Sequence, residues 1–338
     1  MRGNRLASDQ INVAVIGVGA FGRNHARVYH ELEQQGEGVR LSAIVDADVN
    51  RADEVASEYG TRSLGSIEQL LTRSEIQAAS IAVPTVHHME VARELLDAGI
   101  DVLIEKPLAF SLAEADEIIA AAKKQQRVAQ VGHLERFNPA VRATLPLITR
   151  PMFFEVHRLS VFTPRSLDVD VVLDLMIHDL DIVLSFVKSP VKEVRAVGLP
   201  ILSGKVDIAN VRMEFDSGCV ANFTASRVST ERVRKLRFFQ PGQYISVDYG
   251  RQDVMVFAVG DRAAPSSKPS VNPQIAISRP PIVAEEPLHA EIRSFLDAVR
   301  HRTSPVVSLE EGREALALGL EILRAIGEHG SRLDLASG

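Results

Sequence analysis

Apolar runs and amphipathic helical patterns alternate along the first part of the chain. The apolar runs that predict strands cover residues 11–16, 39–46, 78–84, 101–105 and 128–132, and the helical patterns between them cover 21–32, 50–59, 66–72, 86–98 and 112–125. Strands separated by helices of this length predict parallel βαβ units with right-handed crossovers. Apolar runs such as 79–83 are typical of a sheet covered by helices on both faces. We therefore predict a doubly wound α/β domain over residues 9–133.

The pattern changes after Pro139, and strands then follow one another with few helices between them. Expected helices cover 138–148, 171–187, 286–301 and 309–327, expected strands cover 152–160, 191–198, 206–215, 219–228, 233–239, 243–249 and 253–259, and the Pro- and Ser-rich segment 261–284 is expected to be a long excursion. This order predicts an α+β domain with an open, mostly antiparallel sheet over residues 134–338. Its last helix could pack back on the first domain.

An open sheet of this size has one face that its own helices can cover. Four aromatic residues lie in or near the expected strands: Phe153, Phe215, Phe223 and Phe238. Each could fill the core of its own domain, or the set could form an apolar face that needs a partner. We expect the second alternative for the sheet as a whole, and hence a homodimer or homotetramer.

Composition excludes several classes of protein. The net charge of −6 and a pI near 6.0 argue against nucleic acid as the main partner. A single cysteine, Cys219, excludes an internal disulfide, and the sequence has no cysteine or histidine cluster typical of a metal site. No window of about 18 uninterrupted apolar residues predicts a membrane span, and the first residues lack the apolar core of a signal peptide. We expect a cytoplasmic protein without a metal.

The first strand leads directly into a glycine-rich turn and a helix. Gly17, Gly19 and Gly22 form a G-x-G-x-x-G pattern. The first glycine permits a tight turn, the second lets a pyrophosphate approach the backbone, and the third lets the helix pack on the strand. The helix N-terminus then offers N–H groups and a positive dipole end to the anion. The pattern predicts a dinucleotide site that includes Ala20 and Phe21.

An acidic residue, Asp46, ends the second predicted strand. An acid at this place hydrogen-bonds the ribose hydroxyls of NAD and disfavours the 2′-phosphate of NADP. Arg51 is the one nearby cation that could turn toward such a phosphate, and we expect it to face the adenine or solvent. The predicted cofactor is NAD.

Three further clusters lie at or beyond the ends of predicted strands. The first is 83–88, with Pro84, Thr85 and His88; the second is Glu105-Lys106-Pro107; the third is a helix with Asp174, His178 and Asp181. Spacings of four and three place those last three side chains on one helix face. On this polar face, Asp174 and His178 could simply hydrogen-bond each other, and Lys106 could have a purely structural role. The alternative that we favour is a cleft lined by an acid that orients a titratable histidine.

In the same order and spacing, these motifs resemble the Gfo/Idh/MocA oxidoreductases, the group of glucose–fructose oxidoreductase and inositol dehydrogenase, over about residues 10–327. The matching residues are Gly17, Gly19, Gly22, His25, Asp46, Pro84 to His88, Glu105, Lys106, Pro107, Asp174 and His178. The resemblance implies a Rossmann domain, an open sheet used for oligomerisation, and hydride transfer between a sugar-type hydroxyl carbon and nicotinamide. It implies that Lys106 contacts the reacting hydroxyl, that His178 accepts a proton, that Asp174 orients it or the substrate, and that His88 lies near the nicotinamide. Which of Lys106 and His178 is the immediate base stays open.

Two stretches, 132–139 and 171–181, resemble the bacterial UDP-N-acetylglucosamine 3-dehydrogenases within that family. A nucleotide sugar carries a diphosphate, which favours arginine ligands. The expected substrate-binding residues are Lys106, Arg136, Asn138, Arg165, Asp174, His178 and Arg227, and the expected cofactor-binding residues beyond the glycine turn are Pro84, Thr85, His88, Glu105 and Lys106. The alternatives are a dehydrogenase of a free polyol such as an inositol, and a non-catalytic NAD-binding regulator.

Overall fold

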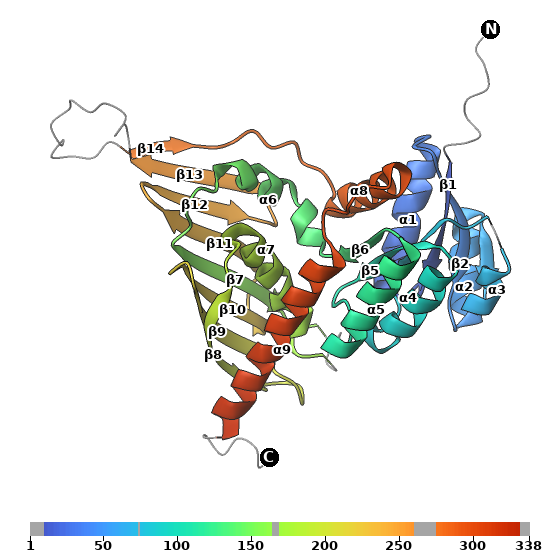
Figure 1. The fold of residues 1–338 in the computed structure, drawn as a ribbon. Helices are drawn as coiled ribbons and strands as arrows, with labels where there is room; N and C mark the ends of the chain where they lie inside the picture. Colours follow the sequence, from blue (N-terminus) through green and yellow to red (C-terminus); the bar gives the residue numbers. More distant parts are fainter. Residues whose placement is uncertain (1–9, 74, 164–168, 260–274, 332–338) are drawn as a thin grey trace, which may run out of the picture. The chain divides into compact units, whose positions relative to one another are not determined.

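The computed structural model describes residues 10–73, 75–163, 169–259 and 275–331. The chain divides into two compact units (Figure 1). Unit 1 extends to Leu134 and resumes over Glu286–Leu316, whereas unit 2 comprises Glu135–Glu285 and the chain from Ala317 onward. The long helix α9 (Leu309–Ser331) is therefore divided between the two units.

Unit 1 contains a parallel sheet of six strands in the order β3-β2-β1-β4-β5-β6. Its elements are β1 (Ile11–Ile16), α1 (Ala20–Gln34), β2 (Val39–Val45), α2 (Val49–Tyr59), β3 (Arg62–Leu64), α3 (Ile67–Leu71), β4 (Ala78–Ile81), η1 (Thr85–His87), α4 (His88–Asp97), β5 (Asp101–Glu105), α5 (Leu112–Gln125) and β6 (Ala129–Gly132). The strand order reverses between β1 and β4, where doubly wound sheets bind their ligands. The predicted α/β fold is confirmed. Strand β3 was not predicted, because three residues with one apolar side chain form no apolar run.

Helix α8 (Pro287–His301) belongs to unit 1, although it follows unit 2 in the sequence. Its residues Leu288, Ile292 and Phe295 pack in the same buried cluster as Leu32 of α1. This is a difference from the predicted boundary, which assigned the helix to the second domain. An amphipathic pattern shows that a helix has a buried face, but it does not show which sheet that face covers.

Unit 2 contains an open sheet of eight strands in the order β14-β13-β12-β11-β7-β10-β9-β8. All neighbouring strands are antiparallel except β7 and β10, which are parallel. The elements are η2 (Leu134–Phe137), α6 (Pro139–Thr144), η3 (Leu145–Leu147), β7 (Phe153–Val161), η4 (Val172–Met176), α7 (Ile177–Val187), β8 (Val191–Leu199), β9 (Ile208–Phe215), β10 (Val220–Ser229), β11 (Val233–Gln240), β12 (Gln243–Asp248), β13 (Asp253–Val259) and β14 (Ile275–Ser278). The predicted open sheet is confirmed, and β14 is an additional strand within the segment expected to be irregular.

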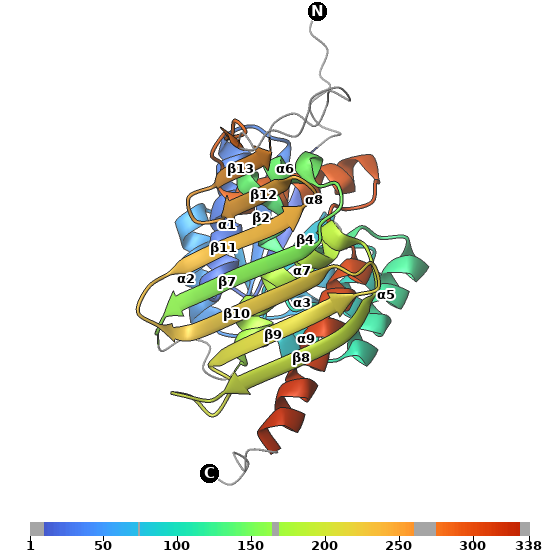
Figure 2. The same ribbon diagram turned by 90° about the vertical axis from the view of Figure 1, so that its left-hand side faces the viewer.

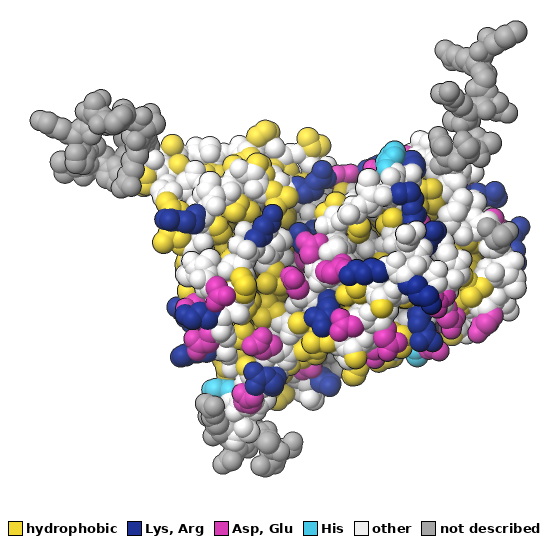
Figure 3. Space-filling view, in the orientation of Figure 1, with side chains coloured by type: hydrophobic (Ala, Val, Ile, Leu, Met, Phe, Trp, Pro, Cys, Tyr) yellow, Lys and Arg dark blue, Asp and Glu magenta, His cyan; other side chains and the backbone are white. Residues whose placement is uncertain are grey.

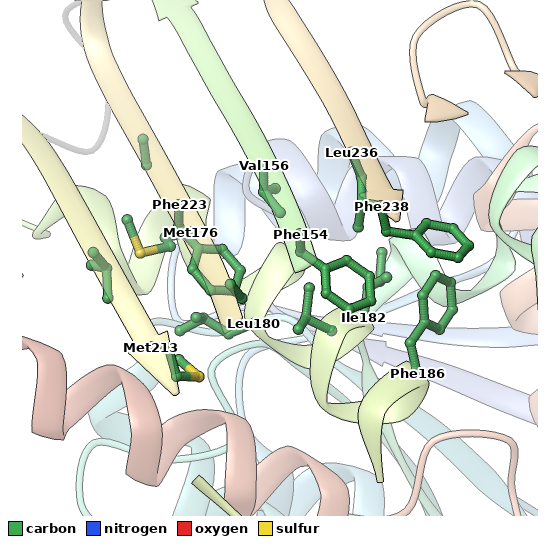
Figure 4. Packing of buried hydrophobic residues seen from close by; sticks show 14 of the residues in the cluster. Phe154, Val156, Met176, Leu180, Ile182, Phe186, Met213, Phe223, Leu236 and Phe238 are labelled. Carbon is green, nitrogen blue, oxygen red and sulfur yellow. The ribbon is translucent and has the colours of Figure 1, made fainter. Parts of the chain in front are cut away.

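One face of this sheet packs against α7 and the later part of α9. Figure 4 shows Phe154 and Phe238, from neighbouring strands, pointing toward Phe186 of α7. The ring centroids of Phe154 and Phe238 lie 5.3 Å apart, and those of Phe186 and Phe238 lie 6.2 Å apart. Leu318 and Ile322 of α9 join the same buried cluster. The core of unit 2 therefore lies between the sheet and these two helices.

Of the two alternatives for the four phenylalanines, the first holds for three of them, which fill the core of their own unit. Phe215, Phe223 and Phe238 are buried in the core of unit 2. Side chains alternate between the two faces along a strand, so only Phe153, which precedes the buried Phe154, points the other way.

A different set of aromatic residues occupies the outer face of the sheet, which Figure 2 shows without a covering helix among the described residues. Phe153, Phe239, Tyr244 and Phe257 form a row across β7, β11, β12 and β13. Successive ring centroids lie 5.7, 5.0 and 5.1 Å apart. We call these four residues the aromatic row.

Two predicted helices differ in detail. The helix expected over 138–148 ends at Thr144, because Pro146 cannot continue an α-helix, and a 3-10 turn follows. The helix expected over 171–187 begins with a π-helical turn, η4, before the α-helical α7. No sequence period distinguishes a π turn, so this difference was not predictable.

The charges on the molecular surface agree with the composition. On the face shown in Figure 3, cationic and anionic side chains are interspersed over the helices. No helix among the described residues is long and apolar enough to cross a membrane.

Candidate active site

Two of the three motif glycines are required by close backbone packing. Gly17 has φ +82°, and a Cβ there would lie 2.8 Å from the backbone nitrogen of Val83. A Cβ on Gly22 would lie 1.8 Å from the carbonyl oxygen of Gly17, so α1 packs directly on the turn. Gly19 meets nothing within 4 Å, and no side chain caps the start of α1. The N–H groups of this helix end are thus open to an anion.

A cavity of about 790 Å³ opens at this turn. The predicted cofactor residues that line it are Gly17, Gly19, Ala20, Phe21, Asp46, Arg51 and Pro84. Those outside its lining are Gly22, Thr85, His88, Glu105 and Lys106. An elongated ligand with an anionic centre fits these walls, because the helix N-terminus is open there and an acid lies at the end of β2. The residues present therefore fit a dinucleotide.

Several residues that line the cavity were missed. They come from α3 and α4 and the turns before them: Ser66, Ile67, Glu68, His87, Glu90 and Glu94. The segment 65–68 follows β3, so recognition of that strand would have placed the segment at the ligand-binding edge of the sheet.

Asp46 is 8% exposed and holds the glycine turn. Its Oδ2 accepts a hydrogen bond from the backbone N–H of Val18 at 2.8 Å, and its Oδ1 accepts one from Asp48 at 2.9 Å. Arg51 lies with Nη1 3.5 Å from Asp46 Oδ2 and Nη2 3.2 Å from Asp48 Oδ2. A carboxylate can accept about four hydrogen bonds, so Asp46 retains capacity for ribose hydroxyls. Arg51 is engaged by two carboxylates rather than turned to solvent alone.

His88 is 1% exposed and joins the loops that follow β4 and β5. Its Nδ1 lies 3.0 Å from the carbonyl oxygen of Pro107, and its Nε2 lies 3.0 Å from that of Val83. Burial lowers the pKa of this imidazole, against the opposing effect of the two carbonyls. The structure gives His88 a role in holding these loops together, and its contact with nicotinamide stays a prediction.

Glu105 ends β5 and Lys106 directly follows it; both residues are partly buried. Glu105 Oε1 lies 2.9 Å from His25 Nε2. Burial alone would raise the pKa of Glu105, but the His25 hydrogen bond and the charges of His25, Lys106 and His88 outweigh it and lower that pKa. Glu105 therefore faces the interior of unit 1. Sequence reasoning matched His25 to the family but missed this pairing, because the two residues lie 80 positions apart.

Asp174 and His178 lie where the π turn passes into α7. Both side chains are partly buried, whereas Asp179 and Asp181 are only 2% exposed. π turns inside helices occur frequently at functional sites. The predicted polar stripe thus divides into two parts: Asp174 and His178 remain accessible, and Asp181 belongs to a buried ion pair. The proton-transfer roles of Asp174 and His178 stay predictions.

A buried charge cluster anchors α7 to its sheet. Arg158 of β7 donates to both oxygens of Asp179, at 2.6 and 2.9 Å, and to Glu135 Oε1 at 3.0 Å. Burial alone would lower the pKa of Arg158, but the charges of Asp179 and Glu135 outweigh it and raise it. Arg234 approaches Glu135 Oε1 at 4.0 Å, and the ring of Tyr249 lies 5.4 Å from the Arg158 guanidinium carbon. Asp179 and Glu135 were missed, since a single buried acid has no sequence signal.

Two predicted substrate residues take part in this buried region. Arg136 Nε donates to Asp181 Oδ2 at 2.8 Å. Asn138 caps α6 through Ala140 N at 3.0 Å, and its amide donates to Glu135 Oε2 and to the carbonyl of Tyr249, both at 3.1 Å. Every polar atom of the Asn138 side chain is thereby engaged within unit 2. Contacts of Arg136 and Asn138 with substrate stay predictions.

Of the two remaining arginines predicted to bind substrate, the structure describes Arg227 and not Arg165. Arg227 is 6% exposed; it donates to the carbonyl of Val169, and its Nε lies 3.7 Å from Asp207 Oδ1. Asp207 in turn accepts hydrogen bonds from the backbone of Ile201, Leu202 and Ser203 at 2.8, 2.6 and 2.8 Å. Arg165 lies outside the described residues. Arg227 thus lies beside Asp207, which holds the loop 201–203. Its role in substrate binding stays a prediction.

Family comparisons agree with this architecture. A model of an oxidoreductase family with an NAD-binding Rossmann fold, Gfo/Idh/MocA, matches residues 11–133, and a model of the Gfo/Idh/MocA C-terminal domain matches residues 151–240. The chain belongs to the Gfo/Idh/MocA oxidoreductase family. The predicted family, the NAD cofactor and the assignment to dehydrogenases are confirmed at this level.

Individual relatives extend the likeness to the whole chain. The UDP-N-acetylglucosamine 3-dehydrogenase of Acidithiobacillus ferrooxidans is 35% identical over 94% of this chain and 97% of its own length. Its solved structure superposes with a TM-score of 0.85, covering 94% of this chain and 98% of that one. The scyllo-inositol 2-dehydrogenase (NAD(+)) of Bacillus subtilis is 28% identical over 65% of this chain and 68% of its own. A levoglucosan dehydrogenase in complex with NADH and levoglucosan, 19% identical with a TM-score of 0.82 over 94% of this chain and 98% of that one, shares the fold.

Proposed function

We propose that this oxidoreductase oxidises the 3-hydroxyl of UDP-N-acetylglucosamine and transfers the hydride to NAD. The observation that carries the proposal is the 35% identity to a UDP-N-acetylglucosamine 3-dehydrogenase, which extends over 94% of this chain. Identity of this extent includes both units rather than the cofactor-binding unit alone. We place the reaction in the cytoplasm, where NAD and nucleotide sugars are available.

The chemical roles follow from what alcohol oxidation needs. Bound NAD supplies the hydride acceptor at its nicotinamide ring. The hydroxyl proton needs a base within hydrogen-bond reach, and either Lys106 or His178 can supply it. Asp174, one helical turn from His178, orients that imidazole or the substrate. The presence of Lys106, Asp174 and His178 favours an enzyme over a non-catalytic NAD-binding regulator.

A free polyol is the second candidate substrate, because the inositol dehydrogenases are also relatives. NADH formation with UDP-N-acetylglucosamine, UDP-glucose, myo-inositol and scyllo-inositol separates the two. We expect turnover with UDP-N-acetylglucosamine, a 3-keto product by NMR, and at least about 100-fold lower kcat/KM with the inositols, since a site built for a charged diphosphate leaves its polar groups unpaired with a polyol. Preferential turnover of an inositol contradicts the proposal.

We further propose that the outer face of the eight-stranded sheet joins copies of this chain into a homodimer or homotetramer. The aromatic row supports this, since Phe239 is 38% exposed and stacks on Phe153 and Tyr244 in a face without a covering helix in the described chain. Light scattering at micromolar concentration should give a multiple of 37.0 kDa. Phe239→Lys should shift the mass toward the monomer, whereas Phe110→Lys, at an exposed phenylalanine of unit 1, should leave it unchanged. A monomeric native protein contradicts this proposal.

A further inference from the structure

A chain of hydrogen bonds inside unit 1 ends at Glu105. Tyr29 Oη lies 2.9 Å from Ser80 Oγ, which lies 3.0 Å from His25 Nδ1, and His25 Nε2 lies 2.9 Å from Glu105 Oε1. A carboxylate only accepts hydrogen bonds, so the proton of a neutral His25 ring sits on Nε2. Nδ1 then accepts from Ser80, whose oxygen accepts from Tyr29. One tautomer satisfies every bond in this chain.

A second carboxyl group lies against the end of this chain. Glu291 of α8 is 0% exposed, and neither of its carboxyl oxygens has a hydrogen-bond partner among the described residues. Ligand atoms of His25, Glu105 and Glu291 all lie within 4.8 Å of one another. The amide oxygen of Gln130, also buried, lacks a partner too, and its Nε2 lies 3.4 Å from the Glu291 carbonyl oxygen. Among the described residues, Glu291 therefore has the acceptor Glu105 within 4.8 Å, and no lysine or arginine donates a hydrogen bond to its carboxyl oxygens.

A buried carboxyl group without a cationic partner is far more stable in its neutral form. A protonated Glu291 has an O–H to donate, and Glu105, whose carboxylate lies within 4.8 Å, can accept it. An ionised Glu291 would instead place two negative charges within 4.8 Å of each other in the interior. Glu105 also packs closely on Gly132, where a Cβ would lie only 3.1 Å from Glu105 Oε1.

We propose that Glu291 is held as a neutral carboxylic acid and acts as a positioning residue for Lys106, by keeping Glu105 the sole anion of this buried cluster. Glu105 directly precedes Lys106, so a displacement of the Glu105 carboxylate would move the peptide that carries the lysine. The link to Lys106 rests on the proposed dehydrogenase function, whereas the charge state of Glu291 does not.

The electrostatics of the cluster agree with one shared proton. Burial, followed by the charge of Glu105, raises the pKa of Glu291 well above its ordinary value, while the pKa of Glu105 is lowered. The groups that face the pair are His25 and Tyr29 from α1 and Lys106 and His88 after β5 and β4. Two carboxyl groups so close titrate as a coupled pair.

Infrared spectroscopy of the full-length protein tests the charge state without any substrate. We expect a carboxylic-acid C=O band at neutral pH that shifts in D₂O, is lost in Glu291→Gln and is retained in Glu314→Gln, a change at an exposed position of α9. In Glu105→Gln the band should disappear at a lower pH, since the repelling neighbour is gone. Absence of the band in the native protein, or an equimolar divalent metal found by elemental analysis, overturns the proposal.

Kinetics test the positioning role. Glu291→Ala should lower kcat about tenfold or more at unchanged KM for NAD, because a small misplacement of a catalytic group has an effect of this size. Glu291→Gln should restore most of the loss and move the alkaline limb of the kcat–pH profile to higher pH. Equal losses in both variants, or an unmoved alkaline limb, overturn the positioning role. If no substrate is turned over while the infrared band is present, the proposed function fails and the charge state stands.

Discussion

The two units bury charge beside their candidate catalytic groups in different ways. In unit 2, Asp179 directly follows His178, and both of its carboxylate oxygens accept hydrogen bonds from the guanidinium of Arg158. In unit 1, Glu105 directly precedes Lys106 and is met by an imidazole and a second carboxyl group. The first cluster is electrically compensated and anchors a helix rigidly. The second cluster, in our proposal, keeps a proton on Glu291, so its charge changes with pH. In the first cluster burial also raises the pKa of Asp179, against the opposing charge of Arg158.

The largest expected effect comes from breaking the compensated cluster. Arg158→Met leaves Asp179 and Glu135 buried without their cation, which should destabilise unit 2 by about 3–5 kcal/mol. Denaturant unfolding measures this difference. Arg195→Met, at an exposed arginine of β8, should change stability by no more than about 0.5 kcal/mol. A small loss in Arg158→Met would show that the cluster is hydrated rather than sealed.

The next largest effects are expected from substitutions of the accessible groups beside the two clusters. Lys106→Ala and His178→Ala should each lower kcat by about 100-fold or more, while NADH binding stays within about twofold because the glycine turn is untouched. His178→Ala should also remove the acidic limb of the pH–rate profile, and Asp174→Asn should have a smaller effect than either. His157→Ala, at an exposed histidine of β7, is the control. Near-normal turnover in His178→Ala would assign the base to Lys106.

Asp207 shows another way to hold a buried carboxylate, because it accepts hydrogen bonds from backbone N–H groups. Burial alone would raise its pKa, but hydrogen bonds from Ser203, Leu202 and Ile201 lower it to about 2. A lowered pKa stabilises the fold above the unfolded-state value, near 4, and that stability is lost as the pH falls toward 2. Asp207→Asn should therefore lose roughly 2 kcal/mol at pH 7, and its difference from the native protein should shrink below pH 4. Asp216→Asn, which is exposed, should show no such trend.

The smallest expected effect concerns cofactor choice in unit 1. Asp46 lines the cavity, and Arg51 is engaged by Asp46 and Asp48, so a 2′-phosphate would meet negative charge. NADH should bind at least about tenfold more tightly than NADPH, about 1.4 kcal/mol. Fluorescence titration measures both affinities, and equal affinities would show that Arg51 leaves its acidic partners to bind phosphate.

Sequence reasoning succeeded where local patterns carry the information. The glycine turn, Asp46 and the parallel strands are specified by residues close in the chain, and the cavity lies where those residues predicted it. The buried partners were not predictable. Glu291 meets Glu105 only because α8 returns to unit 1, and Asp179 meets Arg158 only because β7 lies under α7. Pairings between distant elements have no periodic pattern in the sequence, so the hydrogen bonds of Arg136 to Asp181 and of Asn138 to Glu135 were not predicted.

The return of the chain to unit 1 after unit 2 has a consequence for synthesis. Translation delivers residues up to Leu134 first, but Leu288, Ile292 and Phe295, which pack with α1, emerge only after residues 135–285 have been made. Until α8 is made, the nascent first segment therefore exposes part of its apolar interior to water, a state that favours aggregation or chaperone binding. A fragment cut after Leu134 would keep that exposure permanently. The amino-terminal part of this enzyme is consequently a poor candidate for expression on its own, even though it carries the glycine turn.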